Sequence, residues 1–426
     1  MKTSILLAAV AALPLSASAA TSVENVTVRQ HWPWNGLVDI DYEIVTDDPS
    51  ATFLVYPKGE DRRLGTKAVM RTLSGDGADG PVGPGVHRMV WDAKADMPGF
   101  HTPDFAVSLQ TVSSDAEYLV VDLSGGTNAV TFPVHYSPTG PDIANDKCRT
   151  TELWLRLVMP GTFLMGSPAD EKYRSDENND VQHQVTLTRP FYLGVFELTQ
   201  MQWQLVMGTT NAFYYTGPCR PVDSASFAQV RGVSANGFGN ANDDIAASSF
   251  FGVMRRKAAL PFDLPTESQW EYACRAGTTT AWNDGSGVVA PGMTSQDSNL
   301  NRLGRYNWNI SDGQESYTQH TKVGLYQPNA WGFFDMHGNV CEWCRDAYRA
   351  KWATDALIDP EGGDGATSRV LRGGAWSFYQ SGCHSGSRTS CPSTALKNLN
   401  INPGRSGYSV SASGSVGFRV GCFPVE

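Results

Sequence analysis

The side chains best suited to chemistry in this chain are thiols, which can form metal sites, disulfides and nucleophiles. There are eight cysteines, and all of them follow residue 147. Cys341 and Cys344 form a C-x-x-C motif, a spacing that can bind a metal ion or cycle as a redox pair. A zinc site would need two further ligands, for which Cys383 with His384 or His337 are the candidates. Burial or structural disulfides are the plainer alternatives, and eight cysteines allow about 105 pairings.

A second group of candidates offers hard oxygen ligands. Asp335 and Glu342 flank a stretch that contains Gly338. Calcium prefers oxygen ligands, and a glycine-containing loop can turn its main-chain carbonyls toward one point. Two acids seven positions apart are also common on protein surfaces, so these residues alone leave both interpretations open.

Several catalytic motifs are missing from the sequence. It contains no P-loop, no G-x-G-x-x-G that opens a helix after a strand, and no H-E-x-x-H. No G-x-S-x-G elbow supports a Ser–His–Asp triad. The eight histidines are scattered, so each one alone is expected to be a surface or packing residue.

Charge and composition narrow the class of protein. The net charge is -10 and no basic block stands out, which argues against nucleic acid or an anionic membrane as the partner. A hydrophobic content of 41% with 18% charged residues predicts a folded chain with real cores. A length of 426 residues is enough for two or three domains.

The first twenty residues are typical of a signal peptide. Lys2 gives a positive start, residues 5–15 are apolar, and Ala17–Ala19 is a small-residue site that predicts cleavage near Ala19. The alternative is a short membrane anchor, but the apolar run is well below the thickness of a bilayer. No later stretch is long enough to span a membrane. We therefore expect a secreted, periplasmic or cell-surface protein that is not transmembrane.

Residues 21–140 have the pattern of an all-β domain. Apolar residues alternate with acids over 38–44, and this period of two indicates a strand with one face in water. The runs at 51–56, 87–92 and 105–109 are further strands. Short strands at regular spacing predict a β-sandwich, immunoglobulin-like, with a small barrel as the alternative.

A Pro- and Gly-containing linker at 137–141 separates that domain from residues 146–426. Trp, Gly and Asn rise after the linker, and regular periodicity falls. Two helices are still legible, because Thr199 and Thr266 each precede a Gln by three residues and form a capping box. A Gly stands where each helix would end.

Six motifs stand out in this C-terminal part of the chain. They are Met159–Ser167, Phe191–Gln200, Leu264–Tyr272, Pro328–Trp343, Arg369–Trp376 and Gly417–Val420. In type and order they resemble the formylglycine-generating-enzyme, or sulfatase-modifying factor, family. The resemblance covers roughly residues 150–423, and six ordered motifs argue strongly against chance similarity.

The resemblance implies a compact α+β domain, related to C-type lectins, with little regular secondary structure. It also implies structural calcium, held in the family by two side chains and two main-chain carbonyls. The corresponding residues of this chain are Asp335, Gly338, Val340 and Glu342, and a second calcium site would use Asn299, Leu300 and Asp312.

The same resemblance shows where this chain departs from the family's chemistry. Formylglycine-generating enzymes oxidise a substrate cysteine to an aldehyde and bind copper(I) between two cysteines five positions apart. Cys383 stands at the second position, but the first holds Phe378, which cannot bind a metal. Ala375 replaces the family's active-site Ser, and Cys341 stands where the family usually has Trp. Copper is not expected, because one thiol does not make a two-coordinate site.

Three functions remain open at this point. We favour a catalytically altered or inactive member of the family that acts as an exported accessory or binding module for a protein or a glycan. An active oxidase of protein cysteines or small-molecule thiols, with Cys383 as the catalytic residue, is the first alternative. A cell-surface carbohydrate- or protein-binding module is the second, and it draws only on analogy with lectin-like folds.

Overall fold

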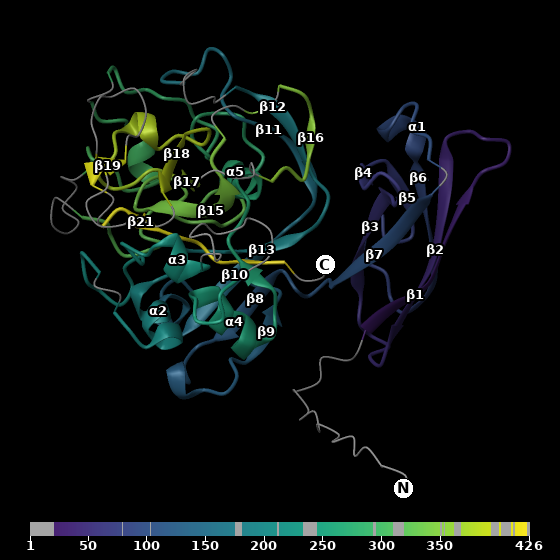
Figure 1. The fold of residues 1–426 in the computed structure, drawn as a ribbon, viewed down its shortest axis with the longest axis horizontal. Coiled ribbons are helices and arrows are strands. Elements are labelled where there is room, and N and C mark those ends of the chain that lie inside the picture. Colours follow the sequence, from purple (N-terminus) through teal and green to yellow (C-terminus); the bar gives the residue numbers. More distant parts are fainter. Residues whose placement is uncertain are drawn as a thin grey trace, which may run out of the picture. The chain divides into compact units, whose positions relative to one another are not determined.

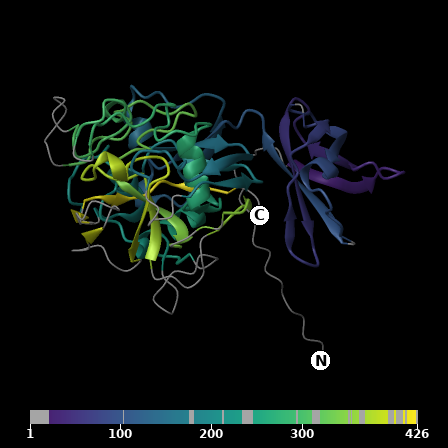
Figure 2. The same ribbon diagram turned by 90° about the horizontal axis from the view of Figure 1, so that it is seen from above.

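The computed structural model describes residues 21–423 apart from short internal segments, and the chain divides into two compact units between Ser114 and Asp115. Figures 1 and 2 trace the chain from purple to yellow. The predicted signal peptide lies outside the described residues. No helix in the described part of the chain is long and apolar enough to cross a membrane. The residues outside the description are 1–20, 79, 103, 175–180, 211–212, 233–244, 293–294, 310–318, 350–351, 353, 362–367, 393–399, 402–409, 412–413 and 424–426.

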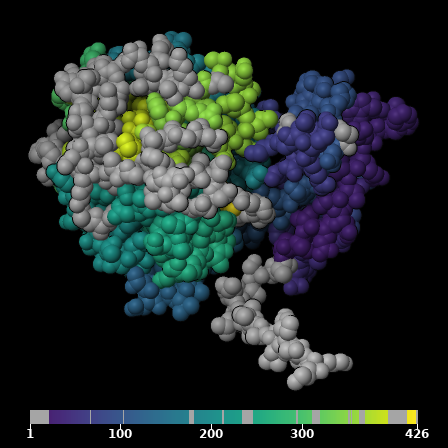
Figure 3. Space-filling view, viewed as in Figure 1, coloured from purple at the N-terminus to yellow at the C-terminus, as the bar shows by residue number. Residues whose placement is uncertain are grey.

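The first unit consists of two antiparallel sheets and one short helix. One sheet has the strand order β1-β2-β6-β5, and the other has the order β4-β3-β7. The outward face of the edge strand β1 is largely exposed, and the purple strands lie at the surface in Figure 3. The elements are β1 Thr21–Gln30, β2 Leu37–Thr46, β3 Phe53–Asp61, β4 Thr66–Ala68, β5 Leu73–Gly75, β6 Gly85–Asp92, α1 Ala93–Asp96 and β7 Phe105–Ser113.

The core of this unit confirms the alternation read from the sequence. Ile40 and Tyr42 of β2 are buried, whereas Asp41 between them is partly exposed. Ile40 pairs with Met89 of β6, and both join Val55 of β3 in one apolar cluster that draws on both sheets. A fully buried side chain of this size contributes about 1.5–3 kcal/mol, so this cluster is the main source of the unit's stability.

The boundary expected near residue 140 is wrong, because two strands assigned to the first domain belong to the second unit. β8 Tyr118–Asp122 pairs antiparallel with β10 Glu152–Val158, and β9 Val134–Ser137 pairs with β8. The partner strand β10 is encoded some thirty residues after β8, so no local pattern gave a sign of this pairing.

The second unit is rich in strands and has few helices. Its sheets have the orders β14-β22-β13-β10-β8-β9, β11-β12-β16, β18-β17-β15-β21 and β19-β20. The remaining strands are β11 Gly161–Met165, β12 His183–Leu187, β13 Phe191–Gly194, β14 Phe262–Asp263, β15 Cys341–Ala347, β16 Leu357–Ile358, β17 Ser368–Arg372, β18 Arg388–Pro392, β19 Asn400–Ile401, β20 Val410–Ser411, β21 Val416–Gly417 and β22 Gly421–Cys422. Short 3-10 turns occupy Gly126–Asn128, Asp146–Arg149, Leu300–Arg302 and Gln380–Gly382.

Both helices predicted from capping boxes are present. Thr199 caps α2 and Thr266 caps α5, and in each box the Gln side-chain oxygen accepts the backbone amide of the cap residue. The helix that Thr199 begins ends at Gly208, which has φ +74° and so adopts a conformation that glycine tolerates best. The helices are α2 Gln200–Met207, α3 Phe227–Val230, α4 Phe250–Ala258 and α5 Glu267–Arg275.

One sheet and one helix position most of the residues discussed below. β15 lies between β17 and β21, and α5 packs against both β15 and β17. These elements lie side by side in Figure 1. The segment that precedes β15 carries the candidate calcium ligands, and the segment between β17 and β18 carries Phe378 and Cys383.

Candidate metal sites and their surroundings

The segment that enters β15 turns sharply. Asp335, Gly338 and Asn339 have φ values of +55°, +81° and +57°. Gly338 is required by space as well, because a Cβ on it would lie 2.0 Å from the carbonyl oxygen of Arg305. The loop is fixed further by the amide of Asn339, which donates to the same carbonyl at 2.8 Å.

The two carboxylates predicted as calcium ligands are both buried. The Gly324 amide donates to Oδ2 of Asp335 at 2.6 Å, while Oδ1 of Asp335 has no hydrogen-bond partner among the described residues. Glu342 is held more fully. Arg419 donates to its two oxygens at 2.8 and 3.0 Å, and Nε1 of Trp270 donates to Oε2 at 2.7 Å.

A third buried acid, Glu197, borders this loop and was not identified from the sequence. Its oxygens accept the Val340 amide at 3.0 Å and the Asn339 side-chain amide at 2.5 Å. Burial, together with the charges of Asp335 and Glu342, raises the pKa of Glu197 well above its ordinary range. Burial likewise raises the pKa of Asp335 to about 6. Glu197 lies more than 130 residues away in the sequence, so only the fold could reveal it.

The charges around this loop do not balance when all three acids are ionised. Glu197, Asp335 and Glu342 are buried near Arg419, with a smaller effect of Arg149 on Asp335. Either protonation, which the raised pKa of Glu197 favours, or a bound cation would remove this excess of buried negative charge. The orphaned Oδ1 of Asp335 is a hard oxygen of the kind that calcium binds.

Two of the three residues expected at a second calcium site, Asn299 and Leu300, lie in the described part of the chain. Asn299 donates its side-chain amide to the Gly287 carbonyl at 3.0 Å. The carbonyl of Leu300 accepts the amides of Leu303 and Gly304 within a 3-10 turn. Asp312 lies outside the described residues, so this second site stays a prediction.

Cys383 is completely buried, and so is Phe378. Phe378 precedes the 3-10 turn Gln380–Gly382, and Cys383 ends it. Burial raises the pKa of the Cys383 thiol to about 12, although a hydrogen bond from the backbone of Ala375 lowers it in part. The sulfur also lies against Gly374, where an added Cβ would approach it to 2.6 Å. A buried thiol with a raised pKa is a poor nucleophile and a poor metal ligand.

The C-x-x-C thiols have different surroundings. After burial itself, the pKa of Cys341 is raised first by the thiols Cys383 and Cys391 and then by Glu342 and Glu197. The pKa of Cys344 is raised by burial and then by Asp346, Glu267 and Glu342. The structure joins none of the eight cysteines in a disulfide, and all eight lie in its described part.

Neither histidine offered as a zinc ligand is placed with the thiols. Nδ1 of His337 is 2.7 Å from the Cys383 carbonyl oxygen, and its Nε2 accepts the Asn283 amide at 3.1 Å. Nδ1 of His384 lies 3.3 Å from Glu171. Among the residues that the structure describes, no group of three His, Cys, Asp or Glu side chains is arranged to hold a metal ion. The C-x-x-C zinc hypothesis therefore gains no support.

A network of buried ion pairs joins α5 to the sheet and was missed at the sequence level. Glu267 accepts two hydrogen bonds from Arg388, at 2.7 and 2.6 Å. Glu271 accepts Nε of Arg275 at 2.8 Å and is also bonded by Arg372. The sequence did offer one sign of this network. Glu267 and Glu271 are four residues apart on a predicted helix and therefore share a face.

Comparison with known proteins identifies the second unit. The sulfatase-modifying factor enzyme 1-like domain matches residues 142–400, which is more than half of the chain. The chain therefore belongs to this family, as the six motifs indicated.

Three curated relatives illustrate the match. The formylglycine-generating enzyme of Thermomonospora curvata is 33% identical over 133 residues, which cover 28% of this chain and 40% of that enzyme. The enzyme of Streptomyces coelicolor is 26% identical over 275 residues, covering 55% of this chain and 82% of that enzyme. A protein of Paenibacillus barcinonensis named chaperone protein LppX is 28% identical over 230 residues, covering 48% of this chain and 75% of that protein.

Among solved structures, PvdO of Pseudomonas aeruginosa covers 63% of this chain and 94% of its own, with a TM-score of 0.46 and 20% identity.

Proposed function

We propose that this protein is an exported member of the family that lacks the two-cysteine copper site and acts as an accessory or binding module. The observation that carries the proposal is Phe378 at the first copper-cysteine position, where its ring is buried. Copper(I) requires soft ligands, and a phenyl ring offers none.

The state of the remaining thiol supports the same proposal. The raised pKa of Cys383 means that almost none of it is thiolate at neutral pH, and the thiolate is the reactive form. Cys341 is a candidate for a substitute sulfur, since its pKa responds to Cys383. Burial raises the pKa of Cys341 as well, so it is no better as a ligand.

The relatives are compatible with an accessory role. The family contains proteins named as formylglycine-generating enzymes and at least one named as a chaperone. Membership alone therefore does not imply oxidase activity. The partner of this chain would be an exported protein or a glycan, since its net charge of -10 disfavours nucleic acid.

Copper binding is the test of this proposal. Purified protein is titrated with copper(I) under reductant in competition with a colorimetric chelator. We expect the chelator to retain the copper(I) in the presence of the wild type and to give it up to Phe378→Cys. Phe378→Ala leaves a similar cavity without a thiol and is the matched control. Stoichiometric copper(I) binding by the wild type that disappears in Cys383→Ser would refute the proposal.

We also propose that calcium binds at Asp335, Gly338, Val340 and Glu342. The unpartnered oxygen of Asp335 and the excess of buried carboxylates support it. Bound calcium would fix the loop that enters β15, and no catalytic role is assigned to it.

Finer features of fold and location belong to the same proposal. The strand orders β1-β2-β6-β5 and β4-β3-β7 resemble the A-B-E-D and C-F arrangement of immunoglobulin sandwiches, which supports that topology for the first unit. The relationship of the second unit to C-type lectins rests on the family resemblance. Export rests on the signal-peptide pattern of the first twenty residues.

A further inference from the structure

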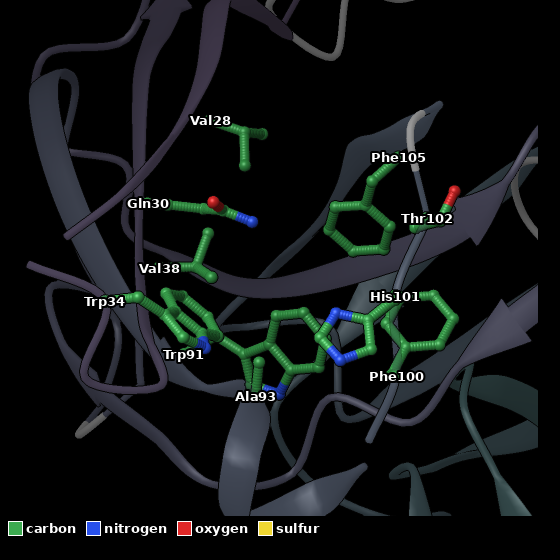
Figure 4. Close-up of a pocket in the computed structure, with 10 residues that line it drawn as sticks. All are labelled: Val28, Gln30, Trp34, Val38, Trp91, Ala93, Phe100, His101, Thr102 and Phe105. Atoms are coloured by element: carbon green, nitrogen blue, oxygen red, sulfur yellow. The ribbon is translucent and has the colours of Figure 1, made fainter. Parts of the chain in front are cut away.

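The first unit contains a pocket that the family's chemistry does not involve. Its volume is about 620 Å³, which lies within the roughly 300–1,000 Å³ typical of ligand pockets. All of its lining comes from the first unit (Figure 4). The lining residues are Val28, Gln30, Trp34, Val38, Trp91, Ala93, Phe100, His101, Thr102 and Phe105.

Aromatic rings dominate the wall, and neighbouring contacts hold three of them in place. Phe105 stacks on Trp91 with ring centroids 5.5 Å apart, and the edge of Phe100 meets Phe105 at 5.8 Å. Nε1 of Trp91 donates to Asp96 at 2.9 Å, which fixes the indole. Rigid rings of this kind contribute binding area with little loss of conformational freedom.

Polar groups reach the pocket from two sides. Gln30 extends from β1 toward the centre, and the Phe105 ring faces it from β7 (Figure 4). His101 and Thr102 lie on the segment that leads into β7. Among the described residues that line the pocket, none is Asp, Glu, Lys or Arg. The pocket therefore combines flat apolar walls with a few hydrogen-bonding side chains.

This combination selects the ligand chemistry. An ionic ligand would find no carboxylate, ammonium or guanidinium group in the lining. The Thr102 hydroxyl is already hydrogen-bonded, since it accepts the Asp104 amide at 3.1 Å. A wholly apolar ligand would cover the side chains of Gln30 and His101 without giving them hydrogen-bond partners, which is unfavourable. A sugar ring has an apolar C–H face that can lie on an aromatic ring and a rim of hydroxyls that can donate and accept hydrogen bonds.

We propose that this pocket binds the neutral end of a glycan, with Trp34 as the stacking surface at its mouth. Trp34 is 47% exposed, so one part of its ring is available to a ligand. The proposal is independent of the copper and calcium sites, because it concerns the first unit alone.

The neighbouring Trp32 provides a matched control. It is 93% exposed and does not line the pocket. Removing either tryptophan should leave the fold intact, because both side chains are largely exposed and neither belongs to the buried core. Equal melting temperatures for the two variants would establish this before binding is measured.

The experiment uses the whole protein in calorimetric titrations with cellobiose, maltose, lactose and N,N′-diacetylchitobiose, and with a capped Phe-Leu-Phe peptide as the apolar probe. We expect saturable binding of at least one sugar with a Kd at or below ~1 mM. Trp34→Ala should weaken it about tenfold or more, and Gln30→Leu, which keeps the size but removes the amide, should weaken it as well. Trp32→Ala should not change it.

Three results would overturn the proposal. They are the failure of all four sugars to bind, sugar binding that is unchanged in both Trp34→Ala and Gln30→Leu, and preference of the pocket for the apolar peptide over every sugar.

Discussion

At the scale of single residues, the buried ion pairs between α5 and its sheet are the contacts whose loss should lower the stability of the fold most. Glu267 and Arg388 are both almost fully buried, and their two hydrogen bonds are short. Such a pair need not stabilise the fold relative to an apolar pair. Removing one partner is costly all the same, because the other charge is left in a dry environment.

We predict that Arg388→Met lowers the free energy of unfolding by about 3 kcal/mol, the lower end of the range for a broken buried pair. The lower end applies because Arg372 remains 3.6 Å from Glu267 and offsets part of the charge. Arg302→Met is the matched control, since Arg302 pairs with Asp284 at the surface and should cost less than about 1 kcal/mol. Urea titration measures both, and similar losses would contradict the account.

The buried thiols predict a second residue-scale effect, on pH. Burial raises the pKa of Cys274 and of Cys383 from 9.0 to about 12. The unfolded chain therefore releases these protons at lower pH than the folded chain does. Their contribution to stability is fully present below pH ~9 and is lost as the pH rises toward ~12, by about 1.4 kcal/mol per pH unit for each thiol.

Chemical unfolding at several pH values between pH ~8 and pH ~10.5 tests this effect. The slope of stability against pH should become shallower by roughly one proton in Cys383→Ala, whatever that substitution does to stability at neutral pH. An unchanged slope in both Cys383→Ala and Cys274→Ala would show that these thiols ionise as they do in the unfolded chain.

At the scale of elements, the loop that enters β15 should respond to calcium. A ligand that binds only the folded state stabilises it by mass action, by about 2.7 kcal/mol when its concentration is one hundred times the Kd. We therefore expect chelator to lower the melting temperature and calcium to restore it. Asp335→Asn should abolish the response, and Asp284→Asn, which alters a surface ion pair, should retain it. A melting temperature that changes with neither chelator nor calcium would contradict the proposed calcium site.

The elements that could be predicted from the sequence are those whose signals are local. The capping boxes at Thr199 and Thr266 identified α2 and α5, and alternation identified β2. The same device at Ser226 with Gln229 was available for α3, but the helix of four residues is too short to show an apolar stripe. Glu197, beside the loop that enters β15, could not be predicted, because its position depends on contacts distant in the sequence.

At the scale of the whole molecule, the division between the units falls at Ser114 and not near residue 140. Strand pairing decides this point. Leu119, Val120 and Val121 of β8 are fully buried within the second unit, next to β10. These three residues form a continuous apolar run, which is compatible with a buried strand but does not show which sheet the strand joins.

We predict that limited proteolysis yields a stable fragment that begins near Asp115. A protein beginning at Asp115 should fold cooperatively, whereas one beginning at Asp146 should unfold at lower temperature, because it lacks β8 and β9 and exposes the edge of β10. Circular dichroism melting compares the two. Equal stability of both fragments would contradict the observed division.

The measurement that tests the central claim most directly is an assay for aldehyde formation. The protein is incubated with copper, oxygen, a reductant and a peptide that contains the sulfatase-type Cys-x-Pro-x-Arg sequence, and the peptide is analysed by mass spectrometry. The presence of Phe378 and the buried, protonated thiol of Cys383 predict that the peptide cysteine stays unchanged. Conversion of that cysteine to an aldehyde by the wild type, lost in Cys383→Ser, would contradict the account and establish an active oxidase.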